Sequence, residues 1–257
     1  MKKIKLLLEY DGTAYQGWQI QKNGLTIQGI IEETIQRITE KQARVISASR
    51  TDAGVHALSQ VIAFRTESCL SPETIKRALN ALLPRDIRVL NAIRVDDSFH
   101  PRHDAKRKSY FYIISNQRES PAFLYRYTWL VQYPLNHTHM RKAARILIGK
   151  HDFSSFRGTG SSTKNNVRKI FSLKIEEFEK IEFMTSSIKG KFVKIRIEAD
   201  GFLRHMVRNI AGTLVEIGRG RIPVSRMEEI LKSRDRRLAG LTAPPNGLFL
   251  DRIVSRY

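Results

Sequence analysis

The chain has 257 residues, 41% of them hydrophobic, and its 45 Lys and Arg outnumber its 25 Asp and Glu to give a formal net charge of +20. This composition excludes a disordered chain and indicates a folded protein with a polyanionic partner such as nucleic acid. Cys69 is the only cysteine, so a disulfide framework is excluded. No apolar run approaches the roughly 20 residues of a membrane span, and we expect a soluble, cytoplasmic protein.

The positive charge is unevenly distributed along the chain. Residues 101–170 hold 14 basic and 3 acidic residues, whereas residues 1–100 hold 14 basic and 11 acidic ones. Together with a polar loop near residue 100, this change predicts two domains, residues 1–104 and 105–257. The second is expected to carry most of the basic surface.

The first hundred residues alternate between strand and helix patterns. The isoleucines of residues 26–40 recur at helical spacing, and Ser71-Pro72 is a typical helix start. The predicted elements are a strand at 3–10, a helix at 26–40, strands at 44–49 and 59–66, a helix from 71 to about 83, and a strand at 87–95.

The remainder has the same character, with longer strand-like runs. The predicted elements are a strand at 106–116, a helix between Asn136 and Gly149, strand-like runs at 167–178, 181–187 and 191–199, a helix at 202–217, and a short helix after Ser225. Hairpin-like spacing between strands favours antiparallel sheets covered by helices, an α+β fold.

Several kinds of site lack the residues they need. Pairs of histidines occur at His100 and His103 and at His137 and His139, but neither pair has partners at a zinc-ligand spacing. No glycine motif for nucleotide phosphates is present, and Cys69 has no base near it in sequence. We therefore predict neither a metal nor a cofactor.

The stretch SASRTDAGVHALSQ (47–60) places one carboxylate, Asp52, between two predicted strands. Ala53 leaves the carboxylate accessible and Gly54 permits a tight turn. A shielded carboxylate nucleophile needs a cation to keep it ionised, and Arg204 and Arg208, four apart on the predicted helix, are candidates. On spacing alone, a nucleophile and an ordinary turn aspartate remain equally acceptable.

Two tyrosines alternate on the strand that opens the second half. Tyr110 and Tyr112 share a strand face next to Lys106, which suits stacking on RNA bases beside phosphate contacts. The alternative is that they line the core. Trp18 is open to the same two interpretations.

The stretch SRTDAGVHAL (49–58) closely resembles the catalytic motif of the tRNA pseudouridine synthase A family. Further blocks resemble that family in the same order along nearly the whole chain. They are YDGTAYQGWQIQ (10–21), TIQGIIEETI (26–35), FHPRHDAKRKSYFYII (99–114), HDFSSFR (151–157), GFLRHMVRNIAGTL (201–214) and LTAPPNGLFLDRIVSRY (241–257).

The resemblance implies an isomerase that converts uridine to pseudouridine at positions 38, 39 and 40 of the tRNA anticodon stem-loop, without a cofactor. It implies two α+β halves with abutting, mostly antiparallel sheets, helices on the outer face, and the active-site cleft between the halves. It also implies a homodimer. Two alternatives remain open: a non-catalytic RNA-binding or RNA-folding protein, and the same chemistry at another RNA position.

The resemblance also assigns roles to residues. Asp52 matches the nucleophile, which would attack the ribose C1′ or the base C6, or assist loss of the C2′ proton. Arg208 matches the basic residue paired with that aspartate, Arg50 the arginine that extracts the base, and Tyr110 the tyrosine that stacks on it. The predicted substrate-binding set is completed by Leu248 or Leu250 as a pocket wall and by Arg102, Lys106 and Arg204.

Overall fold

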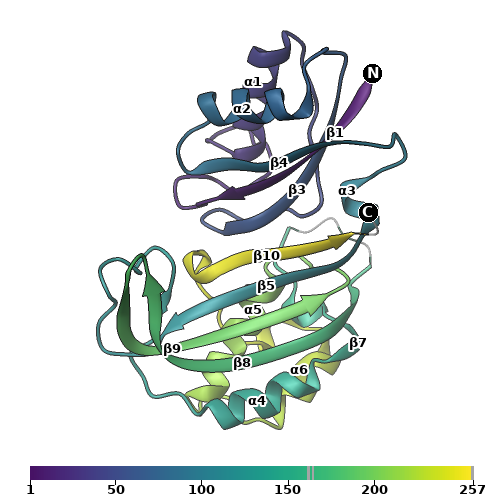
Figure 1. The fold of residues 1–257 in the computed structure, drawn as a ribbon. Helices are drawn as coiled ribbons and strands as arrows, with labels where there is room; N and C mark the ends of the chain where they lie inside the picture. The colour runs from purple at the N-terminus through teal and green to yellow at the C-terminus, as the bar shows by residue number, and fades with distance from the viewer. Residues whose placement is uncertain (161–162, 164, 256–257) are drawn as a thin grey trace. The chain divides into compact units, whose positions relative to one another are not determined.

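The computed structural model describes residues 1–160, 163 and 165–255, which form two compact units. Residues 1–108 and the stretch from Phe249 form the first unit, and residues 109–248 form the second. Both units combine helices with mostly antiparallel strands (Figure 1), which confirms the predicted α+β class. The division at residue 104, and the abutting sheets with a cleft between them, stay predictions.

The sheet of the first unit is built around β1. Its strands are β1 (Lys2–Tyr10), β2 (Ile46–Ser47), β3 (His56–Thr66), β4 (Ile87–Val95) and, apart from its first residue, β10 (Leu248–Ser255). The strand order is β4-β1-β3-β10, with β2 on β3. β1 runs antiparallel to both neighbours, so that Leu6 lies opposite Ile62 and Ala92. β10 runs parallel to β3.

Three helices belong to this unit: α1 (Ile27–Thr39), α2 (Pro72–Leu82) and the short α3 (Pro101–Asp104). α1 and α2 lie side by side against the sheet (Figure 1) and bury their apolar stripes, including Ile31 and Leu79. Thr26 and Ser71 cap their N-termini by accepting backbone N–H bonds, which explains where both helices begin.

The second unit is dominated by one long antiparallel hairpin. Its strands are β5 (Ala105–Ser115), whose first residues belong to the first unit, β6 (Trp129–Leu130), β7 (Gly149–Asp152), β8 (Val167–Phe183) and β9 (Ser186–Ala199). The order is β5-β9-β8-β7, with β6 on β5. Along β9, Val193, Ile195 and Ile197 are buried while the residues between them are partly exposed, as expected for a sheet covered on one face.

The helices of this unit gather on one side of its sheet (Figure 1). They are α4 (His137–Ile146), α5 (Met206–Gly218) and α6 (Arg226–Ser233), with single 3₁₀ turns η1 (Ser154–Phe156), η2 (Arg236–Leu238) and η3 (Pro245–Gly247). Every residue of α5 is buried except Arg208, which is half-buried. The most apolar helix of the chain therefore carries one cation at the margin of its core.

The predicted elements agree with the structure with several exceptions, and α3, β6 and β10 were not predicted. The runs at 167–178, 181–187 and 191–199 form two strands. The middle run contains the hairpin turn, so its first residues end β8 and its last residues begin β9. β7 was not predicted, since its four residues GKHD lack an apolar pattern. The strand predicted at 44–49 is only the two residues of β2. The helix predicted at 202–217 begins at Met206, because His205 before it has a left-handed backbone with φ of 59°.

Candidate active site

Asp52 lies in a tight turn between β2 and β3. The Val55 N–H donates to the Asp52 carbonyl oxygen at 3.2 Å, and Gly54 has φ of +75°, a backbone conformation that residues with a Cβ rarely adopt. The Asp52 side chain is half-buried. Its carboxylate is therefore held on a short turn and partly shielded from water, as a nucleophile requires.

The loop that follows β1 packs directly behind this turn. Gly17 has φ of +87°, and a Cβ there would lie 2.8 Å from the Thr51 carbonyl oxygen; a Cβ on Gly12 would lie 2.0 Å from that of Val55. The Trp18 N–H donates to the Thr51 carbonyl oxygen at 3.0 Å, and its side chain is 1% exposed. The two glycines thus let one backbone support the other, and Trp18 belongs to the core.

A buried polar cluster fixes the residues before Asp52. The Tyr10 hydroxyl and Thr51 Oγ1 lie 2.8 Å apart, and Gln60 Nε2 donates to the Ser49 carbonyl oxygen at 2.8 Å. Gln60 Oε1 accepts the Ser49 N–H at 3.3 Å. Burial raises the pKa of Tyr10 to about 12, against the opposing effect of its hydrogen bonds to Thr51 and Gln60, so the hydroxyl stays neutral.

His56 fixes the residues after Asp52, a role that the sequence did not reveal. Its imidazole is 1% exposed and stacks on Phe249 with the ring centroids 4.6 Å apart. His56 Nδ1 lies 3.1 Å from the Gly12 nitrogen and 3.0 Å from Asp11 Oδ1. Because β10 supplies Phe249, the last strand of the chain helps to hold the far end of the turn.

The basic residues predicted in the first unit are at its surface. Arg50, Arg102 and Lys106 are exposed, and none makes a side-chain hydrogen bond or ion pair to any residue that the structure describes. Partial burial, reinforced by the positive charge of Arg102, lowers the pKa of Arg50. These two guanidinium groups are therefore close enough to repel one another, and both can take phosphate oxygens.

In the second unit, Tyr110 and Tyr112 are both buried. The Tyr110 ring meets Phe202 edge to face with centroids 5.0 Å apart. The Tyr112 hydroxyl donates to the Pro244 carbonyl oxygen at 2.7 Å, and burial raises its pKa, opposed by the charge of Arg208. Tyr112 is thus a core tyrosine with a satisfied hydroxyl, whereas the packing on Phe202 orients the ring of Tyr110.

Arg208 is held by the segment that precedes β10. Its Nε donates to the Ala243 carbonyl oxygen at 2.8 Å, while the Ala243 N–H donates to the Arg208 carbonyl oxygen at 3.2 Å. The first of these bonds fixes the guanidinium at Nε.

The next residue of α5 ties down the same segment, and the sequence analysis missed it. Asn209 is fully buried; its Nδ2 donates to the Phe156 carbonyl oxygen at 2.8 Å, and its Oδ1 accepts from Thr242 Oγ1 at 2.7 Å and Arg236 Nη2 at 3.1 Å. Arg236 Nη1 also donates to the Gly240 carbonyl oxygen at 2.9 Å. A buried asparagine inside an apolar helix is the signal that could have pointed to this cluster.

Arg204 does not share a helix face with Arg208, so that prediction is wrong. It precedes the left-handed residue His205, lies outside α5, and its Nη1 donates to the Thr159 carbonyl oxygen at 3.1 Å. The left-handed residue separates the two arginines, so four-residue helical spacing does not apply.

Leu248 and Leu250 are both buried, at 5% and 0% exposure. Leu250 lies opposite Ala57 in the β3–β10 ladder, and Leu248 follows Gly247, where an added Cβ would lie 2.7 Å from the Tyr112 ring. Neither contact decides which leucine would wall a base pocket.

The predicted site residues divide between the two units. Asp52, Arg50, Arg102 and Lys106 belong to the first, and Tyr110, Arg204, Arg208 and Leu248 to the second. Asp52 and Arg208 belong to different units, so their pairing stays a prediction.

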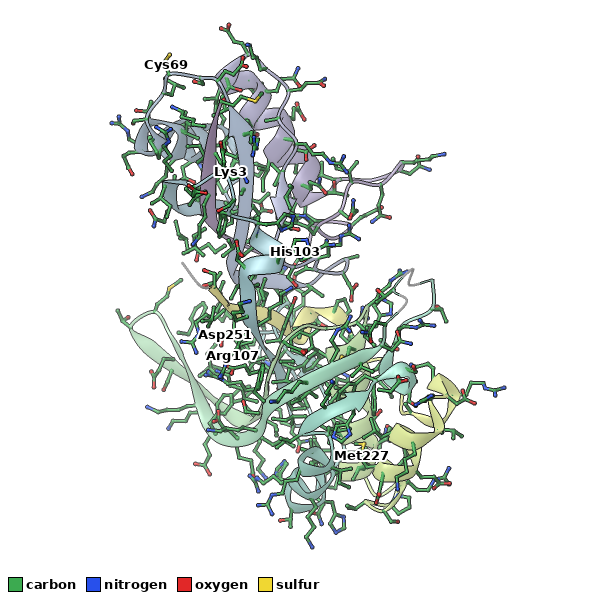
Figure 2. All side chains as sticks on the ribbon, turned by 90° about the vertical axis from the view of Figure 1, so that its right-hand side faces the viewer. Lys3, Cys69, His103, Arg107, Met227 and Asp251 are labelled. Atoms are coloured by element: carbon green, nitrogen blue, oxygen red, sulfur yellow. The ribbon has the colours of Figure 1, made fainter. Side chains whose placement is uncertain are left out.

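The histidines and Cys69 have surroundings of their own. Residues 1–160, 163 and 165–255 contain no cluster of three or more His, Cys, Asp or Glu suited to a metal, and no helix among them is long and apolar enough to cross a membrane. His100 Nδ1 instead accepts the backbone N–H of Arg102 at the start of α3. Cys69 is exposed and lies at the end of the first unit away from His103 of α3 (Figure 2).

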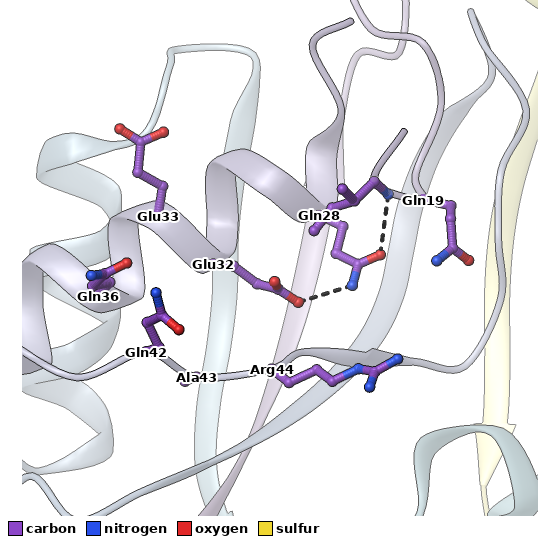
Figure 3. Close-up of a pocket in the computed structure, with 9 residues that line it drawn as sticks. Gln19, Gln28, Glu32, Glu33, Gln36, Gln42, Ala43 and Arg44 are labelled. Carbon is purple, nitrogen blue, oxygen red and sulfur yellow. Dashed lines mark hydrogen bonds between the residues drawn. The ribbon is translucent and has the colours of Figure 1, made fainter. Parts of the chain in front are cut away.

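A hollow of about 590 Å³ lies between α1 and residues 42–44 (Figure 3). Gln28 Nε2 donates to Glu32 Oε1 at 2.9 Å, and that oxygen also accepts the Val45 N–H at 2.8 Å. Glu33 adds a second carboxylate. The lining contains Arg44 as its one cation among the described residues, beside these two carboxylates, and the carboxylates disfavour phosphate, so we do not include the hollow in the active site.

Comparison with known proteins identifies the family of this chain. The tRNA pseudouridine synthase family model matches residues 7–104 and 143–254. The chain is 46% identical to tRNA pseudouridine synthase A of Thermoanaerobacter sp. (strain X514) over 99% of its length and all of that protein. It is 42% identical to that of Thermodesulfovibrio yellowstonii over 99% of its length and all of that protein, and 43% identical to that of Myxococcus xanthus over all of its length and 93% of that protein.

Among solved structures, the archaeal box H/ACA sRNP Nop10-Cbf5 complex matches 82% of this chain and 44% of its own, with a TM-score of 0.32 at 13% identity. That likeness is too low to add to the assignment. The family model and the full-length relatives suffice for it: the chain belongs to the tRNA pseudouridine synthase family, whose enzymes isomerise uridine in tRNA to pseudouridine.

Proposed function

We propose that this enzyme converts uridines 38, 39 and 40 of the tRNA anticodon stem-loop to pseudouridine, with Asp52 as its nucleophile. The observation that carries the proposal is the Asp52 turn. Its backbone is held by Gly17, by the Tyr10–Thr51 hydrogen bond and by His56, while the carboxylate itself remains half-exposed. A rigid turn around one accessible carboxylate supplies the positioning that nucleophilic catalysis needs.

The reaction is an isomerisation in which atoms balance without a co-reactant. The bond between N1 of uracil and C1′ of the ribose breaks, and a bond between C5 and C1′ forms. The proton on C5 leaves, and N1 gains a proton. Asp52 would attack C1′ or C6, or remove the C2′ proton to start the departure of the base. All three routes need an ionised carboxylate, and this requirement gives Arg208 its proposed role as the paired cation.

The other residues would bring the base to Asp52 and hold it there. Arg50 would fill the space left by the extracted base, which offsets part of an unstacking cost of a few kcal/mol. Tyr110, oriented by Phe202, would stack on the base and relay the C5 proton. Leu248 would wall the pocket, and the predicted phosphate-binding residues are Arg102, Lys106 and Arg204.

The proposal extends to assembly and location. We expect a homodimer, as the resemblance implies, in the reducing environment of the cytoplasm, where a chain with one cysteine needs no disulfide. Sedimentation of the purified protein tests the dimer: a single monomeric species at micromolar concentration contradicts it.

The target positions are tested by mapping pseudouridine at single-nucleotide resolution. An unmodified tRNA transcript with uridine at 38, 39 and 40 is incubated with the protein in EDTA and without cofactor. Pseudouridine at those positions, absent with Asp52→Ala, supports the proposal. Pseudouridine at other positions favours the same chemistry on a shifted target, and tight binding with no product on any RNA contradicts the catalytic role of Asp52.

A further inference from the structure

We propose that a hollow between α3 and the β2–β3 edge of the first unit binds a nucleotide of the tRNA within about 20 Å of the target uridine. Arg44, Arg50 and Arg102 would hold the phosphates on either side of it. This inference rests on the proposed function, because it takes Asp52 and Arg50 as the place where the target uridine binds.

The hollow has an apolar floor and a basic rim. Its volume is about 460 Å³, and Ile46, Phe99 and Pro101 contribute to its floor. Lys3 and Arg44 line its rim. Ile46 is 40% exposed although it lies in a strand, so an apolar surface is open to a ligand there. An apolar slot edged by cations matches a nucleotide, whose base or ribose is flat or apolar and whose phosphates are anionic.

The hollow is continuous along the chain with the Asp52 turn. Arg44 lies at its rim, Ile46 in its floor, and the same extended segment reaches Arg50 six residues after Arg44, at most about 20 Å away. On the other side α3 packs against β2, and Arg102 directly follows Pro101 of the floor. Figure 2 shows His103 on the same short helix and Lys3 on β1. A strand of RNA with its target at Asp52 can therefore follow this edge.

The three arginines lack carboxylate partners among the described residues, as expected of residues that bind phosphate. Arg44, Arg50 and Arg102 make no side-chain hydrogen bond or ion pair within the part of the chain that the structure describes. Some exposed arginines are paired instead, as Arg237 is with Asp235 at 2.7 Å. Like charges left together without a carboxylate destabilise the free protein, and a polyanion removes that repulsion.

The residues that line the hollow also favour a nucleotide over other ligands. The lining contains no carboxylate, and the nearby Asp97 already lies 3.5 Å from Arg65. The hollow beside α1 shares Arg44 with this one but has the carboxylates Glu32 and Glu33 in its lining. A second copy of this strongly basic chain would bring further positive charge to the rim, whereas RNA brings the complementary charge.

Two variants with matched controls test the hollow. Ile46→Glu places a carboxylate on the floor, and its control is Leu90→Glu on β4, since Leu90 is also 40% exposed. Arg44→Ala removes one rim cation, and its control is Arg94→Ala, an exposed arginine of β4. The affinity of labelled full-length tRNA is measured from low to high salt, together with kcat at saturating tRNA, melting temperature and sedimentation.

We expect Ile46→Glu to weaken tRNA binding about ten-fold, the size of a lost base contact, with kcat within about two-fold of the original. Arg44→Ala should lower the slope of log affinity against log salt by about 1. Both controls should bind like the unmodified protein. If Ile46→Glu fails to fold, the salt slope of Arg44→Ala still decides.

Equal tRNA affinity in the two variants and their controls overturns the proposal. So does a change of oligomeric state in Ile46→Glu with unchanged affinity, because the hollow would then hold a second copy. Cross-linking from 4-thiouridine placed at single positions along the anticodon stem-loop should, at one of them, reach the peptides containing Ile46 or Pro101. If Asp52→Asn stays active while Ile46→Glu weakens binding, the proposed mechanism fails and the hollow remains an RNA site.

Discussion

The turn that carries Asp52 and the segment 239–247 that holds Arg208 are both irregular, and buried hydrogen bonds fix both of them. They differ in what supplies those bonds. Around Asp52 the side-chain bonds of Tyr10, Gln60 and His56 are joined by close backbone contacts, with Gly17 too near the turn for any side chain. Around Arg208 the support comes from side chains, chiefly Asn209 and Arg236.

This difference indicates how each part should respond to change. Close backbone contacts leave no space for an extra atom, so one added carbon displaces the whole turn. A support made of several side-chain hydrogen bonds can lose one member and retain part of its geometry. We therefore expect steep effects near Asp52 and graded effects near Arg208, except where Arg208 itself is removed.

Among the residues around the Asp52 turn and the 239–247 segment, other than Asp52 itself, the largest effect is expected from Arg208→Ala. Loss of the cation leaves the proposed partner carboxylate uncompensated, and we predict a decrease in kcat of about 100-fold with tRNA affinity changed little. Arg208→Lys should recover part of the rate. Arg226→Ala, which removes an exposed arginine paired with Glu229, is the control. Normal turnover by Arg208→Ala would contradict its pairing with Asp52.

Gly17→Ala tests the backbone support. The added Cβ meets the Thr51 carbonyl oxygen at 2.8 Å on a backbone with φ of +87°, so we predict a loss of about 3 kcal/mol in the free energy of unfolding. Gly220 has φ of +75° and nothing within 4 Å of its Cβ position, so Gly220→Ala should cost only about 1 kcal/mol. Denaturant titration measures both, and equal losses would show that the close approach does not matter.

Asn209→Ala tests the side-chain support. Loosening residues 239–244 should lower kcat about ten-fold without changing KM, since Arg208 keeps its charge but loses a fixed position. Asn80→Ala is the control, because the Asn80 side chain likewise bonds to a residue distant from it, with two hydrogen bonds to the Val89 backbone in the first unit. Both variants should lose stability, and an equal kcat in the two would show that Asn209 is purely structural.

The smallest effect concerns pH. Because the pKa of Tyr10 is raised to about 12 in the folded protein, the folded state binds more protons than the unfolded one above pH 10. The free energy of unfolding should therefore fall between pH 10 and 12, and fall less steeply in Tyr10→Phe. Tyr133→Phe, which changes an exposed tyrosine, should keep the original slope. Identical slopes in all three proteins would argue against the burial of an ionisable hydroxyl beside Thr51.

Much of the fold follows from local patterns. The caps at Thr26 and Ser71 and the alternation in β1 and β5 are features of short stretches, and the structure confirms the helices and strands predicted from them. The left-handed His205 leaves no such pattern, which is why the start of α5 and the placement of Arg204 were wrong. A helix-forming sequence does not reveal at which single residue the backbone becomes left-handed.

The candidate site divides in the same way. Asp52 stands out in a short motif, whereas Gln60, Asn209 and Arg236 act through bonds to residues distant in the chain, such as Ser49 and Phe156. From the sequence alone, a polar residue that bonds to a distant partner cannot be distinguished from an exposed one. Only the folded structure separates the two, by showing that Gln60 and Asn209 are completely buried.

The most direct test of the central role of Asp52 is its replacement by asparagine, which keeps the shape of the side chain and removes its charge. Pseudouridine formation in tRNA and tRNA affinity should be measured on the same Asp52→Asn preparation. We predict no pseudouridine above background, with affinity within about three-fold of the original, because the phosphate contacts are unchanged. Formation of pseudouridine at the normal rate by Asp52→Asn would contradict a nucleophilic carboxylate at this position.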